Sequence, residues 1–153
     1  MIVEQLNWQC CFFTDLKAVE LYAILQLRNE VFVVEQNCVF QDADNKDPFC
    51  YHLCGRYGET LVAYTRLVPP GIAYKEPSIG RVVTSPNYRN TGAGKALMQR
   101  SIAECKKLFG EQVIKLGAQL YLKKFYESFG FVQTSEVYLE DNIPHIEMIL
   151  MVA

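Results

Sequence analysis

One stretch of the sequence combines glycines and basic residues at a spacing that suits phosphate. Gly92 and Gly94 stand between Arg89 and Lys95, after an apolar run and a Ser-Pro turn, and a helical pattern begins at about Gly92. The first turn of a helix has unpaired N–H groups and a positive dipole end, so it attracts anions. Glycines let phosphate oxygens approach without a Cβ in the way. The stretch therefore predicts a loop that binds a phosphorylated cofactor, with Arg89 and Lys95 adding charge.

Two other phosphate-binding motifs do not match this loop. A Rossmann loop has a third glycine and a following acidic residue, and a P-loop has four residues between its glycines and then Lys-Ser or Lys-Thr. Here one residue separates Gly92 from Gly94, and Ala96 follows Lys95. The alternative without a ligand is a helix N-terminus that happens to contain glycines. The loop alone leaves both interpretations open.

The elements around the loop follow a mixed order of strand and helix patterns. Strand patterns cover 8–13, 49–57, 61–68, 78–84, 112–116, 131–138 and 145–152, and helical spacing covers about 15–34, 92–109 and 121–129. A turn is expected at Asp141-Asn142, between the last two strands. Thr14 or Asp15 is expected to cap the first helix. Its apolar face is expected to hold Leu16, Val19, Tyr22, Ala23, Gln26 and Leu27, and Arg28 and Glu30 interrupt this face near the end. This order predicts an α/β (α+β) fold with helices on the faces of a sheet.

Length and composition limit the class of protein. The 153 residues fit one domain, 1–153, and 50% hydrophobic with 21% charged residues is a globular composition. A formal net charge of -2 argues against a nucleic-acid partner. No apolar run approaches the roughly 18 residues of a membrane span, and the start lacks the basic region of a signal peptide. We therefore expect a cytoplasmic protein without a membrane partner.

The six cysteines are expected to be free thiols rather than disulfides or metal ligands. A cytoplasmic chain of this length needs no disulfides. Cys50, His52 and Cys54 alternate and would share one face of a strand, but no second pair of ligands stands elsewhere in the sequence. We expect small buried thiols and no metal.

A second motif lies downstream and gives the loop its context. Gln119 precedes a short helical segment that contains Phe125-Tyr126 and ends at Gly130-Phe131. The Arg-x-x-Gly-x-Gly loop after a Val-Val strand resembles the acetyl-CoA motif of the GNAT N-acetyltransferase superfamily, and the downstream residues resemble its second motif. Further similarity to the ElaA subfamily runs through 25–28, 31–38, 121–126 and 137–146.

This resemblance implies a fold and a cosubstrate. The fold is a mixed, mostly antiparallel central sheet with a splayed pair of parallel strands and helices on both faces, and the cosubstrate is acetyl-CoA. In similar proteins the strand ending at Val82, Val83 and Thr84 pairs with the pantetheine arm, and its N–H groups polarise the thioester carbonyl. Gln119 would bond the pantetheine amides. The residues that would wrap the pyrophosphate are Arg89, Asn90, Thr91, Gly92, Ala93, Gly94 and Lys95.

Tyr126 is the candidate general acid. The leaving thiolate of CoA needs a proton, and a phenol held close can share one. The alternative is a core aromatic residue at helical spacing with Leu122 and Phe129. The surrounding motif favours the functional interpretation.

The general base is left open by the sequence. Some GNAT enzymes carry a Glu on the strand before the second motif, but residues 113–116 contain no acid. The candidates are water or one of four side chains: Glu35, His52, His145 and Glu147. His145 and Glu147 alternate, so both are expected on one side of the last strand.

Two features near the middle of the chain bear on the acceptor. The polar segment 41–47 is acidic, so it is either a solvated loop or a region that attracts a cationic amine. Phe32, Phe40, Phe49 and Tyr51 are either core residues or walls of an acceptor pocket.

We therefore predict an acetyl-CoA-dependent N-acyltransferase that moves an acetyl group to a primary amine of a small molecule or peptide by direct attack on the thioester. The alternative is a non-catalytic CoA-binding sensor or interaction protein. Arg28, Phe32 and Glu35 also show a weaker similarity to acyl-homoserine lactone synthases. A protein with that function would depend on S-adenosylmethionine. A homodimer formed through the terminal strands is compatible with the sequence but not demanded by it.

Overall fold

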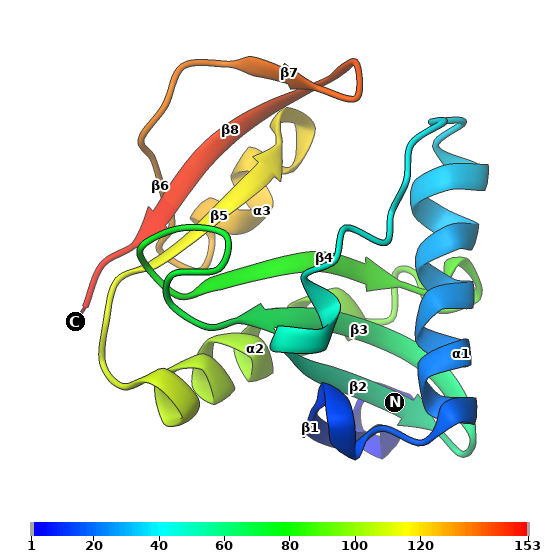
Figure 1. The fold of residues 1–153 in the computed structure, drawn as a ribbon. Coiled ribbons are helices and arrows are strands. Elements are labelled where there is room, and N and C mark those ends of the chain that lie inside the picture. The colour runs from blue at the N-terminus through cyan, green and yellow to red at the C-terminus, as the bar shows by residue number, and fades with distance from the viewer. Residues whose placement is uncertain (1, 153) are drawn as a thin grey trace.

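The computed structural model describes residues 2–152, and Figure 1 shows one sheet with helices packed against it. The strands are β1 (Asn7–Phe12), β2 (Tyr51–Tyr57), β3 (Thr60–Val68), β4 (Ser78–Thr84), β5 (Ile114–Gln119), β6 (Val132–Gln133), β7 (Tyr138–Glu140) and β8 (Ile143–Leu150). The α-helices are α1 (Ala18–Arg28), α2 (Ala93–Phe109) and α3 (Lys123–Glu127). A π-helix, η3 (Asn29–Glu35), continues α1. The short 3-10 turns are η1 (Ile2–Gln5), η2 (Phe13–Asp15), η4 (Asp47–Phe49), η5 (Pro86–Tyr88) and η6 (Leu120–Leu122).

The strand order shows why the sheet opens at its centre. Within residues 2–152 the order is β1-β2-β3-β4-β5-β8-β6, with β7 also paired to β8. All these pairs are antiparallel except β4 with β5, which are parallel and in register only at Ser78 and Lys115. Beyond that point β4 and β5 diverge, as Figure 1 shows. The predicted mixed sheet with a splayed parallel pair is confirmed.

The two faces of the sheet bury different helices. On β2 and β3 successive side chains alternate, so Leu53 and Ala63 belong to the core under α2 and α3, whereas Cys54 and Tyr64 pack against α1 and η3. Figure 1 shows α1 on one side of the sheet and α2 on the other. The predicted placement of helices on both faces is confirmed.

The first helix differs from its prediction in start and in buried face. It begins at Ala18 rather than after a Thr14 or Asp15 cap, and Glu20 accepts a hydrogen bond of 2.8 Å from the Lys17 N–H. Val19 and Tyr22, expected on the apolar face, are 75% and 72% exposed. Leu27 is buried as expected, and the other buried side chains are Ile24 and Arg28, with Val31 continuing in η3. The buried stripe thus includes an arginine, so the helical spacing of apolar residues alone did not identify the buried face.

The end of the first helical segment widens into a π-helix. The Gln36 N–H donates to the Val31 carbonyl at 3.1 Å, and the Cys38 N–H donates to the Val33 carbonyl at 3.0 Å. Both bonds join residues five apart, which defines the π geometry. The predicted helical extent to about residue 34 is confirmed. Its altered geometry sets the direction in which Glu35 and Gln36 project.

A bulge marks the middle of β4. Tyr64 of β3 pairs with Val83, and Arg66 pairs with Gly80, so one residue of β3 faces two residues of β4 between these pairs. Arg81, in the bulge, has a φ of 51°, which is uncommon for a residue with a side chain. The bulge therefore redirects β4 shortly before Val82, Val83 and Thr84.

Three arginines and three aspartates form a closed circuit of ion pairs, here named the Arg–Asp ring. Its members in order are Arg28, Asp42, Arg81, Asp44, Arg66 and Asp47, with successive contacts of 2.7, 2.7, 3.4, 2.7, 3.0 and 2.8 Å. The Arg81 Nε and Asp42 Oδ1 atoms meet without hydrogen-bond geometry, but Arg81 Nη2 donates to the Asp42 carbonyl at 2.9 Å. The other five contacts of the ring are hydrogen bonds between side chains. The ring fastens the polar segment to α1, β3 and the β4 bulge.

The ring corrects both expectations for the acidic segment 41–47. Burial alone would raise the pKa of Asp44 and Asp47, but hydrogen bonds from Arg66 and Arg28 outweigh it and lower the pKa of each. Asp44 and Asp47 are therefore ionised, and each of the three aspartates lies between two guanidinium groups. The segment is neither a solvated loop nor a free negative surface for a cationic amine.

In the described part of the chain, 2–152, no helix is long and apolar enough to cross a membrane.

Candidate active site

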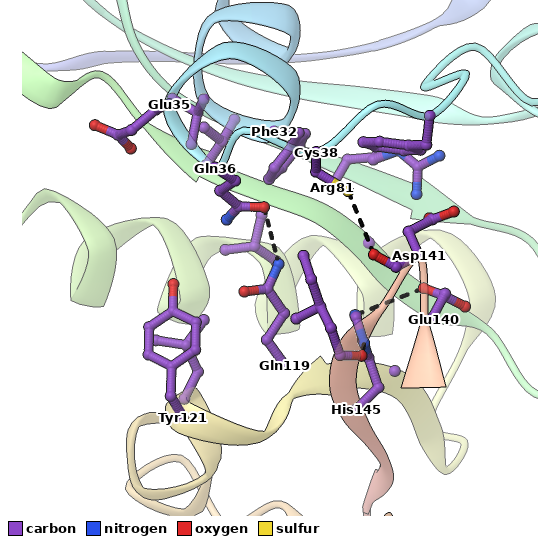
Figure 2. A pocket seen from close by; sticks show the side chains of 18 of the residues that line it. Phe32, Glu35, Gln36, Cys38, Arg81, Gln119, Tyr121, Glu140, Asp141 and His145 are labelled. Carbon is purple, nitrogen blue, oxygen red and sulfur yellow. Dashed lines mark hydrogen bonds and ion pairs between the residues drawn. The ribbon is translucent and has the colours of Figure 1, made fainter. Parts of the chain in front are cut away.

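A cavity of about 700 Å³ opens where β4 and β5 diverge. Its walls come from η3 and the segment after it, from β4, from the end of β5, from α3 and from the β7–β8 hairpin. Figure 2 shows Glu35, Gln36 and Phe32 on one side of it, with Gln119, Tyr121 and His145 opposite. Elements that are distant in sequence thus meet around one space because the parallel pair separates.

Nine of the sequence-predicted site residues line this cavity: Val82, Val83, Thr84, Arg89, Gly94, Gln119, Tyr126, Glu35 and His145. Of the predicted aromatic walls, Phe32 and Phe40 line it, but Phe49 and Tyr51 do not. Phe49 is 58% exposed, and Tyr51 packs against Phe109 in the core.

The other loop residues shape the entry to α2 without lining the cavity. These are Asn90, Thr91, Gly92, Ala93 and Lys95. Asn90 and Gly92 have φ values of 61° and 87°, in the left-handed region, and the Thr91 hydroxyl donates to the Tyr88 carbonyl at 2.6 Å. These contacts turn the chain sharply into α2, whose first N–H groups have no partner within the helix.

His52 and Glu147, two of the four candidate bases, lie outside the cavity lining. His52 is 1% exposed, and its ring nitrogens contact the Tyr64 hydroxyl at 2.6 Å and the Asp47 carbonyl at 3.0 Å. Burial lowers the pKa of His52, which keeps it neutral. Glu147 forms an ion pair with Lys115 at 3.3 Å. Both side chains have structural partners that the sequence did not reveal.

Tyr126 is a buried aromatic residue in the wall of the cavity. It is 5% exposed and its ring packs edge-on against Phe125 and Phe131, at centroid distances of 5.3 and 6.1 Å. Burial raises the pKa of Tyr126 well above its ordinary value, because the phenolate would be poorly solvated. The phenol therefore stays protonated at neutral pH.

The end of η3 holds two of the predicted coenzyme ligands. Glu35 accepts two hydrogen bonds from Arg89, at 2.9 and 2.5 Å, and Gln36 accepts one from Gln119 at 3.3 Å. Hydrogen bonds from Arg89 hold the pKa of Glu35 below its ordinary value. An anion that binds Arg89 must compete with this carboxylate. The contact of Gln36 was not predicted, since the π geometry that directs it leaves no signal in the spacing.

Replacing Glu35 with Gln is expected to tighten CoA binding by about two- to fivefold, the range for losing one exposed competing ion pair. Calorimetric titration of CoA measures the change. The matched control is Glu30→Gln, which removes the same charge from the same π-helix without an ion pair to Arg89. Unchanged or weaker binding by Glu35→Gln would contradict competition at Arg89.

The β7–β8 hairpin adds site residues that the sequence reading missed. Glu140, Asp141 and Ile143 line the cavity, and the Cys38 thiol contacts the Asp141 carbonyl at 3.5 Å. Asp141 and Asn142 have positive φ values of 51° and 63°, as the predicted turn requires. Because the turn was recognised only as a turn, its position over the cavity was not anticipated.

The cysteines of the described region are free thiols. Burial raises the pKa of Cys50 to about 11 and of Cys54 to about 12, so both stay protonated. Among residues 2–152 no three His, Cys, Asp or Glu side chains are grouped to hold a metal ion.

Comparison with known proteins assigns this arrangement to a family. The model of the acetyltransferase (GNAT) domain matches residues 41–152. The chain therefore belongs to the GNAT family and is a GNAT-type acyltransferase, a family that uses acyl-CoA and an amine acceptor. Protein ElaA of Escherichia coli (strain K12) is 41% identical over 145 residues, which cover 94% of this chain and 95% of that protein.

Solved structures agree with this assignment. The crystal structure of an acyl-CoA N-acyltransferase from Pseudomonas aeruginosa has a TM-score of 0.91 and 44% identity, covering 95% of this chain and 99% of that one. The crystal structure of Escherichia coli ElaA has a TM-score of 0.89 and covers 95% and 99% of the two chains. The resemblance to GNAT proteins of the ElaA type is confirmed.

Proposed function

We propose that the protein transfers the acetyl group of acetyl-CoA to a primary amine of a small molecule or peptide, by direct attack of the amine on the thioester. One observation carries the proposal: the β4 segment 82–84, Gln119 and Tyr126 face the same cavity from three different elements. A strand with free backbone groups, an amide and a buried phenol are the groups that such a transfer needs.

The residues present fit acetyl-CoA as a substrate. The first turn of α2 offers unpaired N–H groups to the pyrophosphate, and Gly94 places no side chain between them and the cavity. Beyond Ser78, β4 and β5 are unpaired with each other, so the pantetheine arm has backbone partners on β4. Gln119 can exchange its contact with Gln36 for a pantetheine amide. When bound, the substrate supplies an acyl group activated as a thioester.

Different groups of the protein take the separate roles that the transfer needs. N–H groups around the β4 bulge stabilise negative charge on the thioester oxygen. The Tyr126 hydroxyl gives a proton to the leaving sulfur, since its raised pKa keeps it protonated until then. The acceptor enters on the side of the cavity walled by Phe32, Phe40 and the β7–β8 hairpin.

A non-catalytic CoA sensor remains the second candidate. The observation that favours it is the absence of an acidic residue from 113–116, where some family members carry one. Such a protein would bind CoA at the α2 loop and would need neither Tyr126 nor a base.

The test is thiol release from acetyl-CoA in the presence of a polyamine, lysine, an amino sugar or a peptide with a free N-terminus. We expect amine-dependent release by the wild type, and a kcat about 10²-fold lower for Tyr126→Phe with unchanged CoA affinity, as expected for loss of a general acid. Tyr22→Phe on the exposed face of α1 is the matched control. CoA binding without transfer to any of these amines would favour the sensor.

A further inference from the structure

The two histidines of the chain differ in how their ring nitrogens are used. In His52 both nitrogens have buried partners, the Tyr64 hydroxyl and the Asp47 carbonyl. In His145 the Nδ1 atom lies 2.7 Å from the Ile143 carbonyl. A carbonyl oxygen only accepts, so Nδ1 of the neutral ring carries the proton. Nε2 of His145 is left with a lone pair.

The His145 side chain lines the cavity. His145 on β8 pairs across the sheet with Gln119 on β5, and opposite residues of an antiparallel pair project from the same face. Both side chains line the same cavity as Tyr126, and Figure 2 shows them side by side at its floor. His145 is 8% exposed, so its ring is held in place, and it stacks on Tyr138 at a centroid distance of 5.9 Å.

A carboxylate stands beside this nitrogen. Glu140 Oε2 lies 3.6 Å from His145 Nε2, and the Glu140 side chain is 60% exposed. This distance suits an ion pair once the ring is protonated. A partly solvated carboxylate at the cavity wall also attracts a cationic amine to the point where a base is available.

The other charged groups near His145 do not cancel the negative charge of Glu140. From β7, Tyr138 stacks on the ring and Glu140 lies 3.6 Å from it, and Asp141 of the following turn lines the same cavity. On its own strand Glu147 is paired with Lys115 of β5 at 3.3 Å. Two cations also line the cavity: Arg81 is held by Asp42 and Asp44, and Arg89 is paired with Glu35. The acceptor side therefore has an excess of negative charge next to His145.

We propose that His145 is the general base of the reaction, with Glu140 stabilising the imidazolium that forms. This rests on the proposed transferase function and extends it. The acceptor arrives as an ammonium ion held by Glu140, and Nε2 of His145 removes one proton from it. The amine nitrogen of the acceptor then forms a bond to the thioester carbon as the C–S bond breaks. A second proton passes from this amine nitrogen to solvent. Tyr126 protonates the departing sulfur and takes a proton back from solvent.

A first experiment needs no acceptor. Because the chain has two histidines, ¹⁵N NMR of the imidazole groups resolves both rings. At high pH we expect His145 as the Nδ1–H tautomer and His52 as the Nε2–H tautomer. Glu140→Gln should keep the Nδ1–H tautomer, because the Ile143 carbonyl fixes it, but in the assay below it should raise the KM for the amine several-fold. The control Glu136→Gln, in the same connection but outside the cavity, should change neither. An Nε2–H tautomer for His145 would overturn the role of its Nε2 atom, and an unchanged KM for Glu140→Gln would overturn the role of Glu140.

A second experiment uses the best amine found by thiol release. His145→Gln should lower kcat/KM by about 10²-fold and abolish the acidic limb of its pH profile, with CoA affinity unchanged. A variant with an unchanged pH profile would refute the role of His145 while leaving the transferase function intact. A wild type without transfer activity would instead count against the transferase function, which the NMR result does not depend on.

Discussion

Replacing Arg28 with Met is expected to lower the free energy of unfolding by about 3–5 kcal/mol, the range for removing one partner from a buried ion pair. The Arg28 side chain is fully buried, and its guanidinium contacts Asp42 at 2.7 Å and Asp47 at 2.8 Å. Methionine preserves most of the packing volume but leaves two carboxylates without this partner. The loss is therefore electrostatic rather than a cavity effect.

Urea unfolding at pH 7 measures this change, and Arg56→Met is the matched control. Arg56 pairs with Glu20 at 3.7 Å and is partly exposed, so its loss should cost at most about 1 kcal/mol. Asp47 has a lowered pKa in the folded protein, so its contribution is present above about pH 4 and is lost as the pH falls further. The difference between wild type and Arg28→Met should narrow in acid. Equal losses of unfolding free energy for Arg28→Met and Arg56→Met would contradict a stabilising role of the Arg–Asp ring.

The Arg–Asp ring also links stability to the site. Arg81 in the β4 bulge is held by Asp42 and Asp44, and Asp44 lines the cavity. The ring thereby fixes the uncommon backbone conformation of Arg81 just before Val82. Because the ring holds β4 through the Arg81 side chain, the backbone N–H and C=O groups of β4 that face β5 stay free of hydrogen bonds to the ring.

The parts of the fold that the sequence predicted are those set by local patterns. The strand at 78–84 has the predicted bounds because an apolar run ends at Ser85-Pro86, and α2 begins within one residue of prediction because glycines precede an amphipathic pattern. The turn at Asp141-Asn142 was marked by residues that tolerate positive φ. The strand order was implied by family resemblance, since periodicity carries no information on pairing.

The parts that were missed depend on contacts between distant segments. Arg28 was read as an interruption of an apolar face, because its partners lie 14 and 19 residues further along the chain. His52 and His145 look equivalent in sequence, as both alternate with apolar neighbours. Only the fold buries one between Tyr64 and Asp47 and places the other in the cavity.

A carboxylate at position 94 is expected to abolish CoA binding. A Cβ added to Gly94 would lie 3.9 Å from both Phe125 and Thr84, which is ordinary contact, so a side chain there fits without disturbing the fold. The carboxylate of Gly94→Asp would face the phosphates at the start of α2. Two like charges about 4 Å apart repel by about 4 kcal/mol at a surface dielectric constant, which is about 10³-fold in affinity.

The measurement that tests the site assignment most directly is calorimetric titration of CoA into wild type, Gly94→Ala, Gly94→Asn and Gly94→Asp. A phosphate site at the start of α2 predicts binding by wild type and Gly94→Ala, weaker binding by the uncharged Gly94→Asn, and a loss of affinity of about 10³-fold for Gly94→Asp. Equal binding by the Asp and Ala variants would contradict a phosphate site at α2, and no binding by the wild type would contradict the cofactor itself.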